Sequence, residues 1–181
     1  MDVDNDGRCF TLIRLELLSE ENSIDVYSFE KENREYFERN LPPRPATYFD
    51  SEGFKEITRE LLREQENHDV YMHLIRDAQG TMVGRINLSV LEDDRKTAEL
   101  GYRIGENVTN LGYASEAVKL VLEKAFTTYG LHKIIAGTAT YNLASQRVLL
   151  KNGFTFSKII ENDFQMNNEW INTAVFEIRN L

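Results

Sequence analysis

The chain has 181 residues, of which 41% are hydrophobic, 28% charged and 10% aromatic. This usage is typical of globular proteins and excludes a disordered, collagen-like or low-complexity chain, and the length favours one domain over residues 1–181. The net charge is −9, with both signs mixed along the chain, which argues against a nucleic acid as ligand and mildly favours a cationic partner. The same acidity also fits a charge that only maintains solubility.

The cysteine content and the hydropathy bear on the compartment. Cys9 is the single cysteine, which excludes an internal disulfide, and three scattered histidines indicate no zinc site. Apolar runs are far shorter than the ~18 residues that span a membrane. The first eight residues are polar and acidic, unlike a secretory signal. We expect a cytoplasmic protein that binds no metal and no membrane.

Hydrophobic periodicity predicts elements that follow one another at short spacing. A strand is expected over residues 10–17, and a helix-loop-helix segment over 19–41 with Ser19 as its cap. A further helix is expected over 51–65. The three prolines of the chain lie between these helical segments and separate them, because proline cannot continue a helix.

The pattern then changes to a period of two. Residues 70–76 and 81–91 flank a DAQG turn, which predicts a β-hairpin, and 97–104 predict a third strand. Residues 113–129 carry apolar side chains at helical spacing and form the clearest predicted helix.

The remaining segments are a strand, a helix and two closing strands, over residues 133–140, 142–151, 155–160 and 170–178. Asn142 is the expected N-cap of the helix, and Gly153 lies just past its end. Trp170 is expected to anchor packing, since it buries a large area. The order of elements predicts a mixed α/β sheet.

The junction before residues 113–129 has the chemistry of an anion site. Gly112 and Ala114 are small, and a helix N-terminus offers four unpaired N–H groups and the positive end of its dipole. Small side chains let a phosphate approach the backbone. Such turns also serve close packing of a helix on a sheet, and no Gly-Lys-Ser/Thr follows to make a Walker loop.

Several ordered blocks resemble the GNAT N-acetyltransferase superfamily. Its Gln/Arg-x-x-Gly-x-Gly/Ala signature falls on residues 109–114, and its Asn-x-x-Ser…Gly-Phe pattern on Asn142, Ser145 and Gly153 with Phe154. AELGYRIGE, GYASEAVKLVLEKAF, GLHKI and ASQRVLLKNGF are similar to the ribosomal-protein N-terminal acetyltransferase branch (RimJ/RimL type). KENREYFERNLPP resembles the acceptor-side helices of that branch, and MNNEW its penultimate hairpin. This resemblance implies the GNAT fold, with a mostly antiparallel sheet and splayed middle strands.

The signature departs from the family at three positions. Thr109 replaces the usual Gln or Arg, and Asn110-Leu111 replaces Gly-Lys. Backbone N–H groups survive such changes, but a lost cation weakens phosphate binding because charge-assisted hydrogen bonds are about twice as strong as neutral ones. Asn tolerates a left-handed backbone, which suits position 110. We expect weakened or atypical acyl-CoA binding.

The resemblance implies where acetyl-CoA binds. Pantetheine pairs with one parted strand, the pyrophosphate lies on the 109–114 turn, and charges on the 142–151 helix approach the nucleotide, although these can also be ordinary exposed charges. Backbone N–H groups near 102–104 are expected to hold the oxyanion. The implied cofactor-binding residues are Tyr102, Arg103, Ile104, Thr109, Asn110, Leu111, Gly112, Tyr113, Ala114, Asn142 and Arg147.

Three side chains are candidates for proton transfer. Ser145 matches the serine that protonates the leaving thiolate, although Ser at this helix position also completes caps. Asp163 and Glu99 are alternative bases, and either can instead be a solvated charge or act through water. Arg44, beside the prolines, is a candidate gate of the acceptor site.

The resemblance implies an acetyl-CoA-dependent N-acetyltransferase acting on a protein N-terminal amine of the ribosomal-protein type. One alternative is a small-amine acetyltransferase for a polyamine, amino acid or aminoglycoside. Another is a non-catalytic acyl-CoA-binding module, which the altered Thr109-Asn110-Leu111 segment favours. The penultimate hairpin suggests a possible homodimer.

Overall fold

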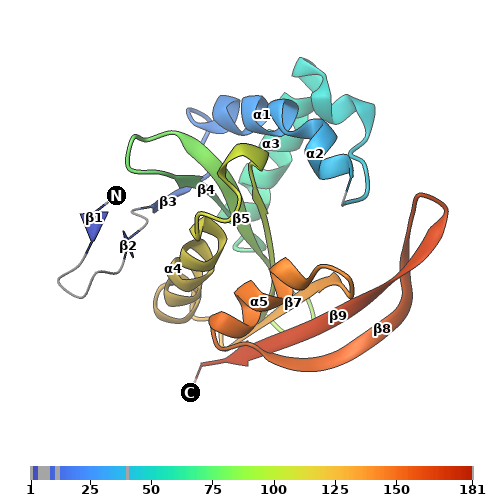
Figure 1. Cartoon of the computed structure of the whole chain (residues 1–181). Helices are drawn as coiled ribbons and strands as arrows, with labels where there is room; N and C mark the ends of the chain where they lie inside the picture. Colours follow the sequence, from blue (N-terminus) through green and yellow to red (C-terminus); the bar gives the residue numbers. More distant parts are fainter. Residues whose placement is uncertain (1, 4–8, 11–12, 40, 181) are drawn as a thin grey trace.

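The computed structural model describes residues 2–3, 9–10, 13–39 and 41–180. Its main feature is a seven-stranded sheet in the order β3-β4-β5-β6-β7-β9-β8, with helices packed against it (Figure 1). Strands β6 and β7 are parallel, and the other neighbouring strands of this sheet are antiparallel. The predicted mixed α/β class is confirmed.

The strands of the sheet are β3 Arg14–Leu17, β4 Val70–Arg76, β5 Met82–Val90, β6 Thr97–Ile104, β7 Lys133–Ala139, β8 Thr155–Met166 and β9 Glu169–Arg179. The helices are α1 Ser23–Glu32, α2 Arg34–Glu38, α3 Ser51–Glu66, α4 Tyr113–Thr127 and α5 Leu143–Lys151, with short 3-10 turns η1 Ala46–Phe49 and η2 Glu106–Val108. A separate ladder pairs β1 Asp2–Val3 with β2 Cys9–Phe10.

Two N-terminal expectations need correction. The strand predicted over 10–17 enters the sheet only at Arg14, and its residues 11–12 lie outside the described chain. Helix α1 begins at Ser23, with Asn22 rather than Ser19 at the N-cap. The Asn22 side chain accepts from Ser19 N at 2.9 Å and donates to Leu17 O at 2.9 Å, so these residues form a turn that ends β3.

The closing hairpin is longer than its apolar pattern predicts. Strand β8 continues to Met166 because Asn167 and Asn168, with φ of 52° and 64°, form a tight left-handed turn that keeps β8 and β9 paired to the tip. Figure 1 shows this hairpin extending beyond the rest of the sheet. Trp170 is exposed, so the expectation that it anchors packing is wrong.

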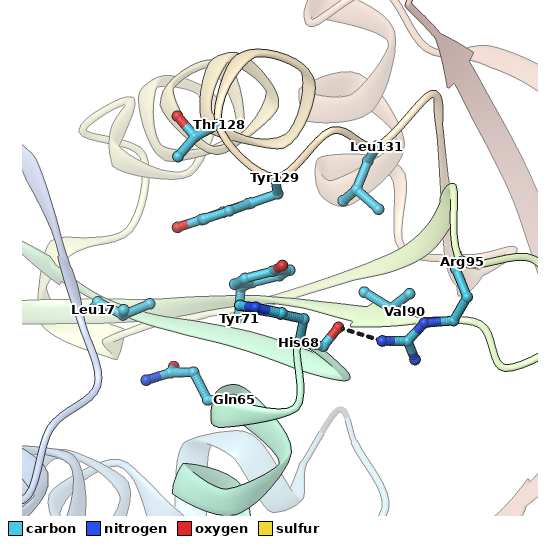
Figure 2. A pocket seen from close by; sticks show the side chains of 9 residues that line it. All are labelled: Leu17, Gln65, His68, Tyr71, Val90, Arg95, Thr128, Tyr129 and Leu131. Carbon is cyan, nitrogen blue, oxygen red and sulfur yellow. Dashed lines mark hydrogen bonds between the residues drawn. The ribbon is translucent and has the colours of Figure 1, made fainter.

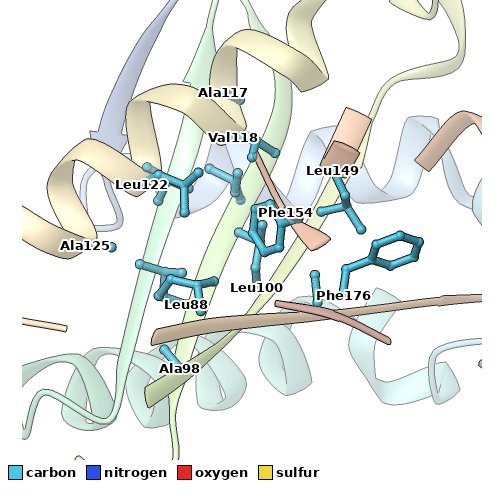
Figure 3. Close-up of a cluster of buried hydrophobic side chains, with 14 of the residues drawn as sticks. Leu88, Ala98, Leu100, Ala117, Val118, Leu122, Ala125, Leu149, Phe154 and Phe176 are labelled. Carbon is cyan, nitrogen blue, oxygen red and sulfur yellow. The ribbon is translucent and has the colours of Figure 1, made fainter. Parts of the chain in front are cut away.

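Each face of the sheet is covered by a different group of helices. On one face, α4 and α5 pack on a core that includes Leu88, Leu100, Val118 and Leu149 (Figure 3). On the other face, α1, η1 and α3 pack with β4 around a second cluster that includes Leu74. The strands between them therefore have one side toward α4 and one toward α1.

A buried histidine of β4 is expected to make folding acid-sensitive. His73 is 1% exposed, its Nε2 lies 2.8 Å from the Tyr129 hydroxyl, and burial, assisted by Lys124, lowers its pKa to about 4. The unfolded pKa is about 6.5, so protonation favours the unfolded chain. This contribution is complete above about pH 6.5, and about 3 kcal/mol is lost as the pH falls to about 4. Urea unfolding measured from pH 7 to pH 5 should show the loss.

Two substitutions separate His73 from the other titrating groups. His73→Gln should remove most of the pH slope, whereas His132→Gln, at an exposed position, should keep it. The Glu16 carboxyl, whose pKa is lowered from 4.5 by its hydrogen bond with Arg76, affects stability mainly below pH 5, outside the measured range of pH 7 to pH 5. An unchanged slope in His73→Gln would contradict the assignment.

Candidate active site

Strands β6 and β7 are paired at one end and parted at the other. They pair in register only from Thr97 with Lys133 to Glu99 with Ile135. Beyond this point, which we call the fork, β6 pairs with β5 up to Ile104, and β7 pairs with β9. Among the described strands, nothing pairs with the facing edges of β6 and β7 past the fork. Their backbone donors and acceptors are therefore open to a ligand.

The turn between β6 and α4 is exposed and left-handed at two positions. Asn110 and Gly112 have φ of 62° and 84°, which confirms the expectation for position 110. Gly112 is the N-cap of α4 without a capping side chain, and the first N–H groups of an α-helix have no acceptor within the helix. The turn therefore presents unpaired donors and the positive end of the α4 dipole to solvent.

A pair of hydroxyl groups connects β6 to α5 past the fork. The Tyr102 hydroxyl and Ser145 Oγ are 2.9 Å apart. Asn142 caps α5 by accepting from Ser145 N at 3.1 Å, so the cap uses the Ser145 backbone and leaves its hydroxyl for Tyr102. Burial raises the pKa of Tyr102, which keeps its phenol protonated at neutral pH. The pair can therefore donate a proton or hydrogen bond at the fork.

Four charged side chains gather on the α1 side of β5 and β6. Glu30 of α1 is 1% exposed and accepts from Arg85 Nε at 2.5 Å and from Arg103 Nη1 at 2.8 Å. Arg44 lies with its guanidinium carbon 4.8 Å from the centre of the Tyr48 ring. We call Glu30, Arg44, Arg85 and Arg103 the arginine cluster.

The electrostatics of the arginine cluster are unbalanced. Burial, with added repulsion from Arg85 and Arg44, lowers the pKa of Arg103 to about 10, although Glu30 acts in the opposite direction. Burial also raises the pKa of the neighbouring Tyr48 phenol, which stays neutral and supplies no compensating charge. One carboxylate thus faces three guanidinium groups.

One hollow of the structure lies away from the fork. It has a volume of about 500 Å³, and its lining includes Tyr71 of β4, Tyr129 just past the C-terminal end of α4, and Arg95 (Figure 2). The Tyr71 and Tyr129 rings stack with centroids 3.7 Å apart. The turn at Gly112 is at the opposite end of α4, so this hollow is not part of the candidate site.

Comparison with known proteins decides the family. Residues 13–155 match the family model described as an Acetyltransferase (GNAT) domain. The chain belongs to the GNAT acetyltransferase family. This GNAT chain is also 30% identical over 176 residues to the probable N-acetyltransferase YjcK of Bacillus subtilis (strain 168), and the match covers 96% of each chain. None of the described helices combines the length and hydropathy needed to cross a bilayer.

Solved structures share the GNAT fold with this chain. A ribosomal-protein-S5-alanine acetyltransferase from Vibrio fischeri superposes with a TM-score of 0.87 at 19% identity, covering 96% of both chains. A spermidine N-acetyltransferase from Vibrio cholerae, in complex with CoA and spermine, superposes with a TM-score of 0.77 at 18% identity, covering 92% of this chain and 95% of that one. At such identities the likeness establishes the fold, and the acceptors differ between the two neighbours.

The GNAT structure brings some of the predicted site residues together. Tyr102 and Ser145 are in contact, and Glu99 is the last residue of β6 paired with β7, exposed at the fork. Arg147 is exposed on α5, and no described residue forms an ion pair with it. Asp163 is exposed within β8, near the tip of the long hairpin, and no described contact joins it to the other candidates.

Two features of the site lie beyond what the sequence reasoning identified. Arg103 was expected only as backbone for pantetheine, but its side chain points to the α1 face and pairs with Glu30. Tyr102 was expected in the same backbone role, yet its hydroxyl is bonded to Ser145. Strand alternation places Tyr102 and Arg103 on opposite faces, which was a usable signal, whereas Glu30 is 73 residues from Arg103 and reads as an ordinary helix charge.

Proposed function

We propose that this GNAT chain transfers an acetyl group from acetyl-CoA to a primary amine, the α-amine of a protein N-terminus. The observation that carries the proposal is the fork, where two parallel strands part beside the unpaired N-terminus of α4. A thioester chain lies in such an opening with its amides on the β6 edge, and its diphosphate lies on the α4 turn. The similarity in fold to acetyltransferases for ribosomal proteins supports the acceptor class.

The residues present fit the CoA diphosphate without a cationic side chain in the turn. Thr109, Asn110 and Leu111 carry no charge, so binding depends on the N–H groups at the start of α4 and on the helix dipole. Arg147, exposed on α5 without an ion-pair partner in the described chain, is the cation we assign to the nucleotide phosphates. We assign Asn142, the N-cap of α5, to a contact with the pantetheine or the sulfur region.

The reaction is a direct transfer. The free amine nitrogen attacks the thioester carbonyl carbon, a backbone N–H of residues 102–104 holds the oxyanion, and the carbon–sulfur bond breaks to release thiolate. The ammonium proton leaves to a carboxylate, directly or through water. Position favours Glu99, which lies at the fork, over Asp163, which lies near the hairpin tip. Ser145, in contact with Tyr102, donates a hydrogen bond to the leaving thiolate, and the thiolate takes its proton through this pair from water, so that neither hydroxyl is left ionised.

Ser145→Ala is expected to lower kcat about tenfold, with a smaller effect on KM. The hydroxyl acts on charge that develops only as the thiolate leaves, so its removal weakens the transition state more than the bound substrate. Tyr102 and water can still donate a hydrogen bond to the thiolate, which limits the decrease in kcat. Steady-state CoA release measures the effect, with Ser157→Ala, exposed on β8, as the control. An unchanged kcat in Ser145→Ala would contradict the assignment.

A paired assay tests the proposed function. The protein is incubated with acetyl-CoA and either N-terminal peptides of ribosomal proteins or spermidine, and both CoA release and acetylated products are measured by mass spectrometry. Acetylation at the peptide α-amine supports the proposal. Acetylation of spermidine alone would assign a small-amine enzyme instead. CoA binding by calorimetry without any turnover would indicate a non-catalytic module.

A further inference from the structure

The arginine cluster carries more positive charge than its own carboxylate can balance. Glu30 is shared between Arg85 and Arg103, whose side chains are 10% and 12% exposed. The three arginines and one glutamate sum to a formal charge of +2 in a region that is largely withdrawn from water. Buried charges are normally paired, because the cost of leaving water is offset only by a partner. The surplus of positive charge therefore favours the binding of an anion beside the cluster.

Arg44 is the member of the cluster that no carboxylate neutralises. Its Nε is buried and has no hydrogen-bond partner, and the described chain provides no ion pair for its guanidinium. Its guanidinium lies over the Tyr48 ring. Arg44 is half-buried, so part of its side chain remains within reach of solvent. A guanidinium group recognises a planar carboxylate through two parallel hydrogen bonds.

The cluster borders the face of β6 that a second substrate can use. Alternation along β6 places Arg103 on the same face as Gly101 and Glu99, and Arg103 lies about 7 Å along the strand from Gly101. The opposite face is covered by α4. An amine that approaches the fork without displacing α4 must therefore come from the α1 side, past Glu99 and the cluster.

Helix α1, which covers this face of β6, is in contact with the chain that follows β6. Asn33, in the break between α1 and α2, accepts through Oδ1 from Glu106 N at 2.9 Å. A Cβ on Gly105 would lie 3.2 Å from the Phe29 ring of α1, so the helix packs closely on the chain just after β6. These contacts join α1, which carries Glu30, to the segment of chain that follows β6.

We propose that the acceptor is an amine that also carries a carboxylate, and that Arg44, within the arginine cluster, binds this carboxylate while the amine reaches the fork. This inference rests on the proposed function and narrows its acceptor class. The expected acceptors are peptides with an acidic residue close to the N-terminus, or small amino acids. A polyamine is disfavoured, because its ammonium groups would meet the cationic surplus.

Matched substrates test the carboxylate. Peptide amides with Glu or Gln at the second, third or fourth position differ only in charge, as do 4-aminobutyrate and 4-aminobutanamide. We expect kcat/KM to favour the acid by about tenfold or more at one position, the low end for a hydrogen bond to a charged group. The preference should reside in KM, because the carboxylate is held equally in substrate and transition state. The two sets separate a peptide from a small amino acid.

The variant Arg44→Gln tests whether Arg44 is the source of the preference for the acid over the amide. In Arg44→Gln the ratio of acid to amide should fall to about twofold or less, whereas Arg59→Gln, an exposed arginine of α3 that pairs with Glu56, should keep the wild-type ratio. Urea unfolding checks that both variants fold. Equal kcat/KM for acid and amide in the wild type, or a preference that survives in Arg44→Gln, would overturn the proposal.

A binding measurement keeps the test independent of turnover. Calorimetric titration of the CoA-bound protein with the same acid and amide pairs, and with inorganic phosphate, is compared in wild type and Arg44→Gln. Acid-selective binding that Arg44→Gln abolishes supports the anion site even if no acceptor is acetylated, in which case the proposed function fails alone. Binding of phosphate but not of any carboxylate, or no difference between acid and amide, overturns the inference.

Discussion

Gly112→Asp should weaken CoA binding about 100-fold while leaving the protein folded. At the N-cap of α4, the new carboxylate accepts from the same N–H groups that we assign to the diphosphate, and it repels the phosphate charge. Two unit charges about 4 Å apart near a protein surface interact by about 4 kcal/mol, and screening at this exposed turn reduces the repulsion to about 3 kcal/mol. Since about 1.4 kcal/mol changes affinity tenfold, this repulsion corresponds to about 100-fold. Isothermal titration with CoA measures the effect.

Two further substitutions separate charge from backbone strain. Gly112 has φ of 84°, a conformation that costs a side chain about 1–2 kcal/mol, so strain alone could disturb the turn. Gly130, just past the C-terminal end of α4, has φ of 65°. Gly130→Asp therefore introduces a similar backbone strain far from the turn, and this variant should bind CoA normally. Gly112→Asn offers a cap without charge and should fall between the two. CoA affinity at the wild-type level in Gly112→Asp would refute the assigned phosphate site.

The part of the fold set by local pattern was predictable from sequence. The apolar spacing within residues 70–76 and 97–104 predicts two strands, and the structure has β4 and β6 there. The predicted helix cap at Asn142 is also present. Each of these predictions depends only on residues that are close in sequence. The left-handed backbone at Asn110 was also a local inference, because Asn tolerates this region. The resemblance to GNAT proteins added the opening between β6 and β7, which no property of either strand alone predicts.

The arginine cluster could not be predicted because it depends on distant partners. Glu30 and Arg85 are separated by 55 residues, and Glu30 stands in the sequence beside Lys31 and Glu32, which are exposed in the structure. The extent of β8 was missed for a different reason. The residues around Asp163 show no clear alternation, and pairing with β9 is maintained by the left-handed turn at Asn167 and Asn168. As a result, Asp163 lies on the extended hairpin.

Glu30→Gln should lower the free energy of unfolding by about 3–5 kcal/mol, the cost of leaving a buried charge without its partner. The substitution conserves size and removes the charge that Arg85 and Arg103 share, so both guanidinium groups remain buried without a carboxylate. This is a large share of a typical stability of about 5–15 kcal/mol. Urea unfolding at neutral pH measures the change in midpoint and slope.

Other variants show whether the cost reflects burial or simply a lost ion pair. Glu38→Gln breaks an exposed pair with Arg34 on α2 and should cost less than about 0.5 kcal/mol. Replacing Glu30, Arg85 and Arg103 together by apolar residues of similar volume should be neutral or stabilising by about 1–4 kcal/mol, as for other buried ion networks. A loss below about 1 kcal/mol in Glu30→Gln would mean that water reaches the arginines, since hydrated guanidinium groups need no partner. A stable triple variant would show that the fold does not require the cluster, and its charges would then be retained for what they bind.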